Sequence, residues 1–465
     1  MPKDKRNIII VGAGVAGLTQ AVALMREKPD LKVTVISPKD DDKNFKHRAS
    51  TALIVPQVFE QLQELLDDDI YQTLIENDIE QCQNLFLDFF GVEALLDFKD
   101  KNKFVACDPQ FRINDALEEQ AIKLGIEFVD ASVDTIRTDG EYRSVGYTPN
   151  QTDESKGANG KVFSLDADLV LIANGINSQL SNDLGMTPTK IDTPFEYKWI
   201  TFDMPEQLSE DLTVPFVARV GKSKDEPSVQ IGCYPGADKK LVVYIAVDKG
   251  RNISIDDAIH DPRIPSNMRD FLQENVPDTR PEINKNCDVS LRLENWPEGV
   301  FPIGDTMVSL NPRTGDGIRL AMLNACGIAK VIMLEGGVAT IPEQSINRIK
   351  FLAANMALTS TNSPFAVAWP RQDELGFAAS LGDNPQARGV LLSAFMTTGV
   401  DVDGINDKYD SGELQATLQP LIDTASHASG DPEASAKLNV LLARVFKDFN
   451  FGLTTDPIKA QLGIY

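Results

Sequence analysis

The fold is decided by residues 8–18, which read Ile8-Ile9-Ile10-Val11-Gly12-Ala13-Gly14-Val15-Ala16-Gly17-Leu18. The four β-branched residues at the start predict a buried strand. The residues from Thr19 to Met25 continue with the apolar spacing of a helix. A strand, a glycine turn of the form G-x-G-x-x-G and a helix, in this order, predict a dinucleotide-binding unit.

Each glycine of this turn has a separate physical role. Gly12 permits the tight turn, Gly14 lets the main chain approach a pyrophosphate, and Gly17 lets the helix pack closely on the strand. The first helical turn, which includes Ala16, would offer N–H groups and a positive dipole end to the phosphates. We therefore predict that these four residues bind a nucleotide cofactor.

The second strand leaves the identity of the nucleotide open. Residues 31–36 read as a parallel strand, and an acidic residue normally follows it to hold the ribose hydroxyls. This sequence instead has Ser37, with Lys39 shortly after it. Either Ser37 and Lys39 accept a 2′-phosphate, which makes the site specific for NADP, or FAD binds there with a weaker ribose contact.

Composition excludes several classes of function. The chain has 465 residues, so two or three packed lobes are expected. Its net charge of −24 argues against partners that are nucleic acids or anionic membranes. It has neither an apolar run of membrane-spanning length nor a signal peptide before the first strand, and its five scattered cysteines lack C-x-x-C spacing. We expect a cytoplasmic protein with reduced cysteines, no membrane span and, with only three distant histidines, no metal site.

The order of patterns along the chain predicts an α/β fold with an inserted sheet. A buried strand ends at Asn174-Gly175, alternating apolar and polar residues follow, and strand-like sequence resumes before Gly304-Asp305. We predict a Rossmann-like, cofactor-binding domain interrupted by an antiparallel substrate domain and followed by a helical C-terminal region. The predicted boundaries are 1–80, 107–185 and 296–337 for the first domain, 81–106 and 186–295 for the second, and 338–465 for the helical region.

Three of these features, in this order, resemble the group A flavin monooxygenases with the para-hydroxybenzoate hydroxylase-like fold. They are the first glycine turn, Asn174-Gly175, and Gly304-Asp305 followed by Pro312 and by Gly315-x-Gly317. The form of residues 309–312 looks most like the epoxidase and tailoring-hydroxylase branch. The resemblance implies that the nucleotide at Ser37 is FAD.

The resemblance also assigns roles to individual residues around that FAD. Asp305 would hold the ribityl chain, and the N–H groups of Gly315, Gly317 and Ile318 would stabilise negative charge on the reduced flavin ring. The remaining expected cofactor contacts are made by Arg48 on the adenosine side, Arg112 at a helix start, Val133 on a strand, and Asn174 with Gly304 in the turns.

By the same resemblance, the chain would be an FAD-dependent monooxygenase. Through a flavin C4a-hydroperoxide it would hydroxylate or epoxidise an aromatic or olefinic small molecule. The substrate would lie between the flavin and the inserted sheet, near Tyr234, Tyr244 and Arg219, and near the loop that contains Pro312 and Arg313. Tyr234, Pro312 and Arg313 are the expected catalytic residues.

Two choices stay open at this point. The family usually has Asp-Gly where this chain has Asn174-Gly175, so the electron donor is either NAD(P)H or a separate flavin reductase. The same scaffold also serves flavin halogenases, dehydrogenases or reductases, and FAD-binding proteins without catalysis.

Overall fold

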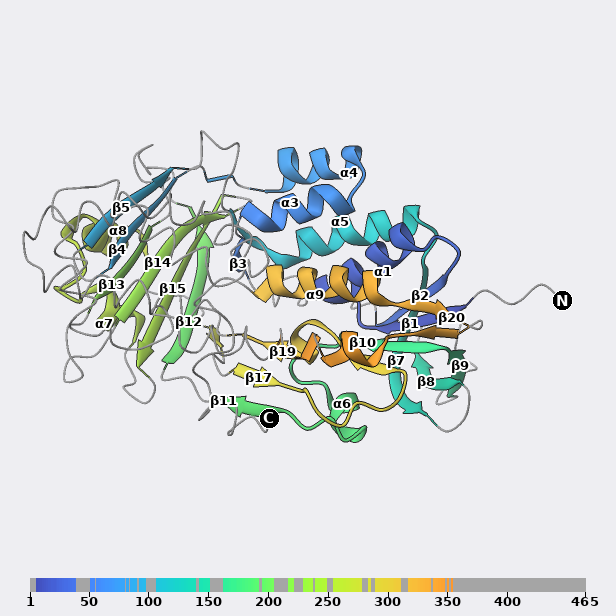
Figure 1. Ribbon diagram of the computed structural model, residues 1–465. Coiled ribbons are helices and arrows are strands. Elements are labelled where there is room, and N and C mark those ends of the chain that lie inside the picture. Colours follow the sequence, from blue (N-terminus) through green and yellow to red (C-terminus); the bar gives the residue numbers. More distant parts are fainter. Residues whose placement is uncertain are drawn as a thin grey trace, which may run out of the picture.

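The computed structural model describes most of the first 353 residues. The described residues are 6–38, 51–54, 56–79, 81–82, 84–89, 92–97, 106–138, 142–150, 162–191, 195–204, 216–220, 229–236, 239–248, 254–277, 283–285, 289–310, 317–335, 338–347, 349–350 and 353. Figure 1 shows two sheet-containing parts side by side.

The first part is built on a mostly parallel sheet. Within the described residues its strand order is β18-β10-β1-β2-β7-β8-β9. The first five of these strands run parallel, and β8 and β9 continue the sheet as antiparallel strands. The strands are β1 (Asn7–Val11), β2 (Lys32–Ser37), β7 (Glu127–Arg137), β8 (Arg143–Pro149), β9 (Phe163–Ala167), β10 (Leu169–Ile172) and β18 (Val300–Pro302).

Helices cover one face of this sheet. Successive side chains of β1 point to opposite faces, so only alternate residues contact the helices. Ile8 and Ile10 pack under the helices, whereas Ile9 and Val11 pack with the β7–β8–β9 strands and the segment around α6 (Gln179–Asp183). The covering helices are α1 (Val15–Glu27), α3 (Pro56–Leu65), α4 (Asp68–Thr73), the π-helix η1 (Leu74–Asp78), α5 (Gln110–Lys123) and α9 (Gly317–Val331). The predicted strand, glycine turn and helix are therefore present in that order.

The second part is a sheet inserted between segments of the first. Within the described residues the strand order is β16-β12-β15-β14-β13-β4-β5. The strands are β4 (Asn84–Phe89), β5 (Val92–Asp97), β12 (Phe195–Asp203), β13 (Phe216–Val220), β14 (Val229–Gly236), β15 (Lys240–Asp248) and β16 (Ile283–Lys285). The apolar alternation of residues 216–247 thus becomes neighbouring antiparallel strands.

This sheet differs from the sequence prediction in two respects. β13 pairs with β4 in parallel, because β4 comes from the earlier excursion of the chain and not from a hairpin with β13. The segment predicted as sheet also contains two helices, α7 (Ile255–Ile259) and α8 (Ser266–Asn275). α7 begins at a capping box in which the hydroxyl of Ser254 accepts from the Asp257 N–H at 3.0 Å and the Asp257 carboxylate accepts from the Ser254 N–H at 2.9 Å.

Short strands complete the described structure. β3 (Thr51–Ile54) pairs with β6 (Ala106–Pro109), and β17 (Val289–Leu291) lies between β11 (Thr189–Ile191) and β19 (Val308–Ser309). β20 (Met333–Glu335) pairs with β21 (Val338–Thr340), although the sequence predicts helix from residue 338.

Residues 343–347, 349–350 and 353 are helical, as predicted, and the rest of the predicted helical region lies outside the described residues. In the described part of the chain, no helix is long and apolar enough to cross a membrane.

Candidate functional site

The turns after three neighbouring strands form the candidate site. β1, β10 and β18 lie side by side and run in one direction, so their carboxyl ends meet at one edge of the sheet. Each strand is followed by a turn with a glycine at positive φ: Gly12 at 108°, Gly175 at 83° and Gly304 at 56°. Ligands of open α/β sheets bind outside the carboxyl ends of the strands. The fold therefore brings together the three motifs that the sequence singles out.

Gly12 and Gly17 set how closely the first helix approaches the sheet. A Cβ atom at Gly12 would lie 2.6 Å from the carbonyl oxygen of Ala173, and one at Gly17 would overlap the carbonyl oxygen of Gly12. The N–H of Gly12 donates to the carbonyl oxygen of Ile36 at 2.9 Å, which ties the turn to β2. A larger residue at either glycine would push α1 away from the sheet.

Gly14 differs, because its surroundings are open. It is exposed, and an added Cβ would meet no protein atom within 4 Å. It is the N-cap of α1, which begins without a side-chain cap and without an acidic residue in its first turn. The first-turn N–H groups lack intrahelical acceptors, and the helix dipole favours an anion there. This end of α1 fits a pyrophosphate that approaches over Gly14.

The Gly304 turn packs against the start of α1. The methyl group of Ala16 occupies the space that a side chain at Gly304 would need, and Ala321 of α9 lies on the same side. α9 begins at Gly317, and Ile318 is buried in the core under the helices. The start of α9 therefore lies beside the turns, whereas Pro312, Arg313 and Gly315 fall outside the described residues.

Thr306 connects the Gly304 turn to the Asn174-Gly175 turn. Its hydroxyl accepts from the N–H of Gly175 at 2.8 Å and donates to the carbonyl oxygen of Gly175 at 3.2 Å. The side chain of Asn174 is exposed, and its Oδ1 lies 3.5 Å from the same hydroxyl. The two turns are thus fixed relative to each other.

Asp305 lies between Gly304 and Thr306 in a short 3₁₀ helix, η5 (Gly304–Thr306). Its side chain is exposed to solvent on one side, yet the surrounding chain desolvates the carboxyl and raises its pKa to about 6. A carboxylate with few protein partners and partial solvent access is suited to accept hydrogen bonds from ligand hydroxyl groups. The contact of Asp305 with a ribityl chain stays a prediction.

The described residues near Ser37 include a carboxylate that the sequence analysis missed. Ser37 at the end of β2 is the register partner of Asp130 on β7. Their neighbours Val35 and Phe128 pack on the helix-covered face, so by alternation both side chains point to that face. Asn150 donates to Asp130 Oδ1 at 2.6 Å and orients the carboxylate. Asp130 lies on the strand beside the expected position, and only the strand pairing reveals it.

The other predicted contacts on the nucleotide side have different outcomes. Arg112, in the first turn of α5, is largely buried and pairs with Asp78 at 3.0 Å. Val133 is half-buried on β7, next to a bulge in its pairing with β8. Arg48 lies outside the described residues. Arg112 lies on α5 and Val133 on β7, the next element along the chain, and their contacts with a cofactor stay predictions.

The second sheet presents an aromatic face. Ile231 on β14 and Val243 on β15 pack under α7 and α8, so the alternating side chains Tyr234 and Tyr244 point to the opposite face. In Figure 1, α7 and α8 lie on the side of this sheet away from β1 and β10. The aromatic face therefore turns toward the first part, as expected for Tyr234, while the side chain of Arg219 lies outside the described residues.

Tyr244 is the centre of the aromatic face. Its ring stacks on Tyr234, with centroids 5.7 Å apart and planes 10° from parallel, and on Tyr197 at 5.8 Å. Trp199 lies tilted against it at 5.5 Å, and Gln230 donates to its hydroxyl at 2.8 Å. These contacts hold several planar rings in one layer.

Gly232 is the register partner of Tyr244 across β14 and β15. A Cβ at Gly232 would overlap the Tyr244 ring, so the ring lies directly over the glycine. This glycine therefore sets the height of the Tyr244 ring above the sheet.

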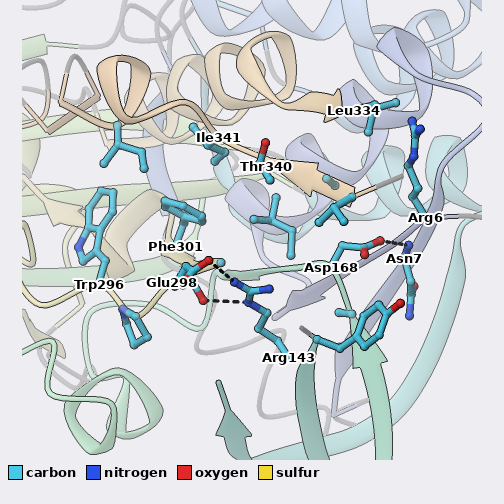
Figure 2. Close-up of a pocket in the computed structure, with 18 of the residues that line it drawn as sticks. Arg6, Asn7, Arg143, Asp168, Trp296, Glu298, Phe301, Leu334, Thr340 and Ile341 are labelled. Carbon is cyan, nitrogen blue, oxygen red and sulfur yellow. Dashed lines mark hydrogen bonds and ion pairs between the residues drawn. The ribbon is translucent and has the colours of Figure 1, made fainter. Parts of the chain in front are cut away.

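A separate pocket of about 1510 Å³ opens at the opposite end of the first sheet. Figure 2 shows Asn7 at the start of β1, and Asp168 just before β10, whose carboxylate accepts from the Asn7 N–H at 3.0 Å. Arg143 donates to the carbonyl oxygen of Glu298 at 2.9 Å and pairs with its carboxylate at 3.3 Å. Because these residues lie at the amino ends of the strands, this pocket is not the site formed by the glycine turns.

Comparison with known proteins agrees with this geometry. A family model described as an FAD binding domain matches residues 5–339. The fold is similar to that of the flavin-dependent brominase Bmp2 (TM-score 0.64, 13% identity, 88% of this chain and 99% of that chain). It is also similar to OxyS anhydrotetracycline hydroxylase from Streptomyces rimosus (TM-score 0.57, 15% identity, 85% of this chain and 76% of that chain). A third similar structure is CtdE in complex with FAD (TM-score 0.52, 19% identity, 76% of this chain and 89% of that chain). No protein of curated function matches the sequence significantly.

Proposed function

Since the chain belongs to the FAD binding domain family and is an FAD-dependent oxidoreductase, we propose that it is a monooxygenase that hydroxylates or epoxidises an aromatic or olefinic small molecule. The observation that carries this proposal is the placement of the glycine turns at the edge of one sheet, with the aromatic face of a second sheet turned toward them. A cofactor held by the turns and a planar substrate held on that face would meet between the two sheets.

The residues around the turns would hold FAD by separate contacts. The first turn of α1 would bind the pyrophosphate over Gly14, and Asp305 would accept hydrogen bonds from the ribityl hydroxyls. Asp130 would supply the carboxylate for the ribose hydroxyls that Ser37 does not supply. The N–H groups at Gly317 and Ile318 would stabilise negative charge on the flavin ring, because a helix N-terminus favours anions. Bound and reduced, FAD supplies the activation of O₂.

The aromatic face would bind and orient the substrate. Tyr234 and Tyr244 are buried and stacked, so their rings form a rigid layer that would support the surface on which a planar molecule lies. Their positions are fixed by Gly232 and by the hydrogen bond from Gln230. Binding there would exclude water from the reacting atoms, while one oxygen atom passes to the substrate and the other leaves as water.

The electron donor forms part of the proposal. We infer NAD(P)H as the donor, since the oxygen transfer consumes two electrons in addition to O₂. Asn174 is exposed, and the resemblance to the group A flavin monooxygenases implies an aspartate at its position, so a separate flavin reductase is the alternative source.

The test follows the flavin and then the product. Oxidised holoenzyme is mixed with NADPH or NADH without O₂, and the loss of flavin colour is followed with and without aromatic or olefinic candidate substrates. A parallel sample receives reduced FAD from a flavin reductase. Isotopically labelled O₂ is then admitted in the presence and absence of chloride and bromide.

One labelled oxygen atom in the product is the expected result. A halogenated product would replace the proposal with halogenation, the activity named for the brominase of similar fold. Flavin reduction by the substrate itself, without oxygen incorporation, would indicate a dehydrogenase. No turnover with any electron source would indicate an FAD-binding protein without catalysis.

A further inference from the structure

Arg292 is a buried arginine whose side chain spans the two turns of the FAD site. It follows β17 and is 2% exposed. Its Nη1 donates to the carbonyl oxygen of Thr306 at 3.1 Å, and its Nη2 donates to the carbonyl oxygen of Ile176 at 2.8 Å. Its main-chain N–H donates to the carbonyl oxygen of Met307 at 2.8 Å. One guanidinium thus connects the turn after β18 to the turn after β10.

The buried guanidinium of Arg292 lies in an unusual environment, because its charge is not neutralised by a nearby carboxylate of the described residues. Among the described residues it has no carboxylate partner, and its Nε has no hydrogen-bond acceptor. A buried cation without a counter-ion is costly, so such a residue is retained where its geometry or its charge is needed. The negative charge of a bound FAD pyrophosphate would lie at the same edge of the sheet and would offset part of that cost.

Arg143 provides the contrast. It is also buried, and it also donates to a main-chain carbonyl, that of Glu298. It pairs with the Glu298 carboxylate, however, and it lies beside the pocket at the opposite end of the sheet. The two arginines share burial and a carbonyl partner, but only Arg292 touches the turns.

We propose that Arg292 is a positioning residue for FAD, which holds Asp305 and the Asn174–Ile176 turn at the spacing that the cofactor requires. Asp305 directly precedes Thr306, so the carbonyl contact of Arg292 acts one residue away from the carboxylate. The planar fork of arginine reaches both carbonyls at once, whereas a lysine ammonium has no such fork. This inference rests on FAD binding and not on the oxygen transfer proposed above.

The test is a double-mutant cycle on FAD affinity. The apo forms of wild type, Arg292→Met, Asp305→Ala and the double variant are titrated with FAD, and the quenching of flavin fluorescence gives each Kd. Arg292→Met is expected to weaken binding by on the order of 10-fold. In the Asp305→Ala background the same change is expected to weaken it by about 3-fold or less, because the residue that Arg292 positions is gone.

Two further variants make the result specific. Arg292→Lys keeps the charge but not the fork and is expected to restore FAD affinity only in part. Arg143→Met removes the matched arginine and is expected to change FAD affinity by about 2-fold or less, even where it lowers the melting temperature. If Arg292→Met does not fold, the cycle is measured with Arg292→Lys in its place.

The proposal is overturned by any of three results. Additive effects of Arg292 and Asp305 would mean that Arg292 does not act through the carboxylate. Wild-type affinity in Arg292→Lys would mean that the fork is unnecessary. An equal loss in Arg143→Met would mean that both arginines act only through stability. Because each of these experiments measures the dissociation constant of FAD, a negative result would contradict the role of Arg292 but not the proposed oxygen transfer.

Discussion

The N–H of Gly175 donates a hydrogen bond of 2.8 Å to the hydroxyl of Thr306, and this contact joins two turns that lie 131 residues apart in the chain. Asp305 precedes Thr306, so the placement of its carboxylate depends on a turn from a distant part of the sequence. The first three predictions concern this carboxylate.

Asp305→Ala should weaken FAD binding by on the order of 10-fold or more, because a hydrogen bond to a charged group contributes about 1.5–3 kcal/mol. The measurement is a fluorescence titration of the apo protein with FAD. Asp30→Ala, which removes an exposed aspartate between α1 and β2, is the matched control and should leave the affinity unchanged. Equal affinities in wild type and Asp305→Ala would refute the role of Asp305.

FAD affinity should rise as the pH increases from 5 to 7. Desolvation raises the pKa of Asp305 to about 6 in the apo protein, so the carboxyl is partly protonated below that pH. FAD hydroxyls that donate to the carboxylate favour its ionised form, and binding therefore releases a proton. Titrations at several pH values test this, and the rise should be absent in Asp305→Asn.

The same shift predicts how the stability of the apo protein depends on pH. The folded state binds the proton of Asp305 more tightly than the unfolded state, whose ordinary pKa is 3.8, so stability should fall as the pH rises from about 4 to above 6. Solvent on the exposed side screens this cost, and the change should be small. Thermal unfolding of wild type and Asp305→Asn across this range measures it. A wild-type profile no steeper than that of the variant would contradict the prediction.

Alanine at Gly14 should lower FAD affinity, whereas alanine at Gly17 should lower the stability of the protein. Gly14 has φ −79° and open surroundings, so Gly14→Ala should fold normally but lose FAD affinity, because the new methyl group would occupy the approach of the pyrophosphate. Gly17→Ala should lower stability by about 1–3 kcal/mol, because its Cβ would overlap the carbonyl oxygen of Gly12. Melting temperatures of the apo proteins and FAD titrations separate the two effects. Full FAD affinity in Gly14→Ala would show that the cofactor does not pass over this residue.

Asp130→Ala should weaken FAD binding more than Ser37→Ala does. A carboxylate accepts two ribose hydroxyls more strongly than a serine hydroxyl does, so the loss at Asp130 should be about 10-fold. Asp134→Ala removes an exposed acid farther along the same strand and serves as the control. If Asp130→Ala and Asp134→Ala bind FAD equally well, the ribose contact belongs to another residue.

The sequence predicted those parts of the site that are encoded locally. The turn at Gly12, the buried strand before Asn174 and the Gly304-Asp305 turn each depend on a few consecutive residues, and each lies where the pattern placed it. Tyr234 was assigned to the inserted sheet, and its face follows from strand alternation. Pro312, Arg313, Gly315 and Arg48 lie outside the described residues, and their roles stay predictions.

The missed features all depend on pairing between distant segments. Asp130 could not be assigned, because only the β2–β7 register places it beside Ser37. Arg292 gave no signal, since a single arginine after a short strand is usually exposed, and its two carbonyl partners come from separate turns. The parallel pairing of β13 with β4 was missed for the same reason.

The strand order also constrains the time at which the protein becomes able to bind its cofactor during synthesis. β10 pairs on one side with β1, where Leu169 faces Ile8, and on the other with β18, where Val170 faces Val300. While the ribosome adds the second sheet, the nascent chain has no β18 to cover that edge of β10, and an unpaired edge invites association with other chains. If Asp305 and the start of α9 hold FAD as proposed, FAD cannot act as a folding ligand until β18, Asp305 and α9 have been synthesised. Nascent chains arrested before residue 300 should therefore fail to retain FAD, whereas those that extend beyond α9 should capture it.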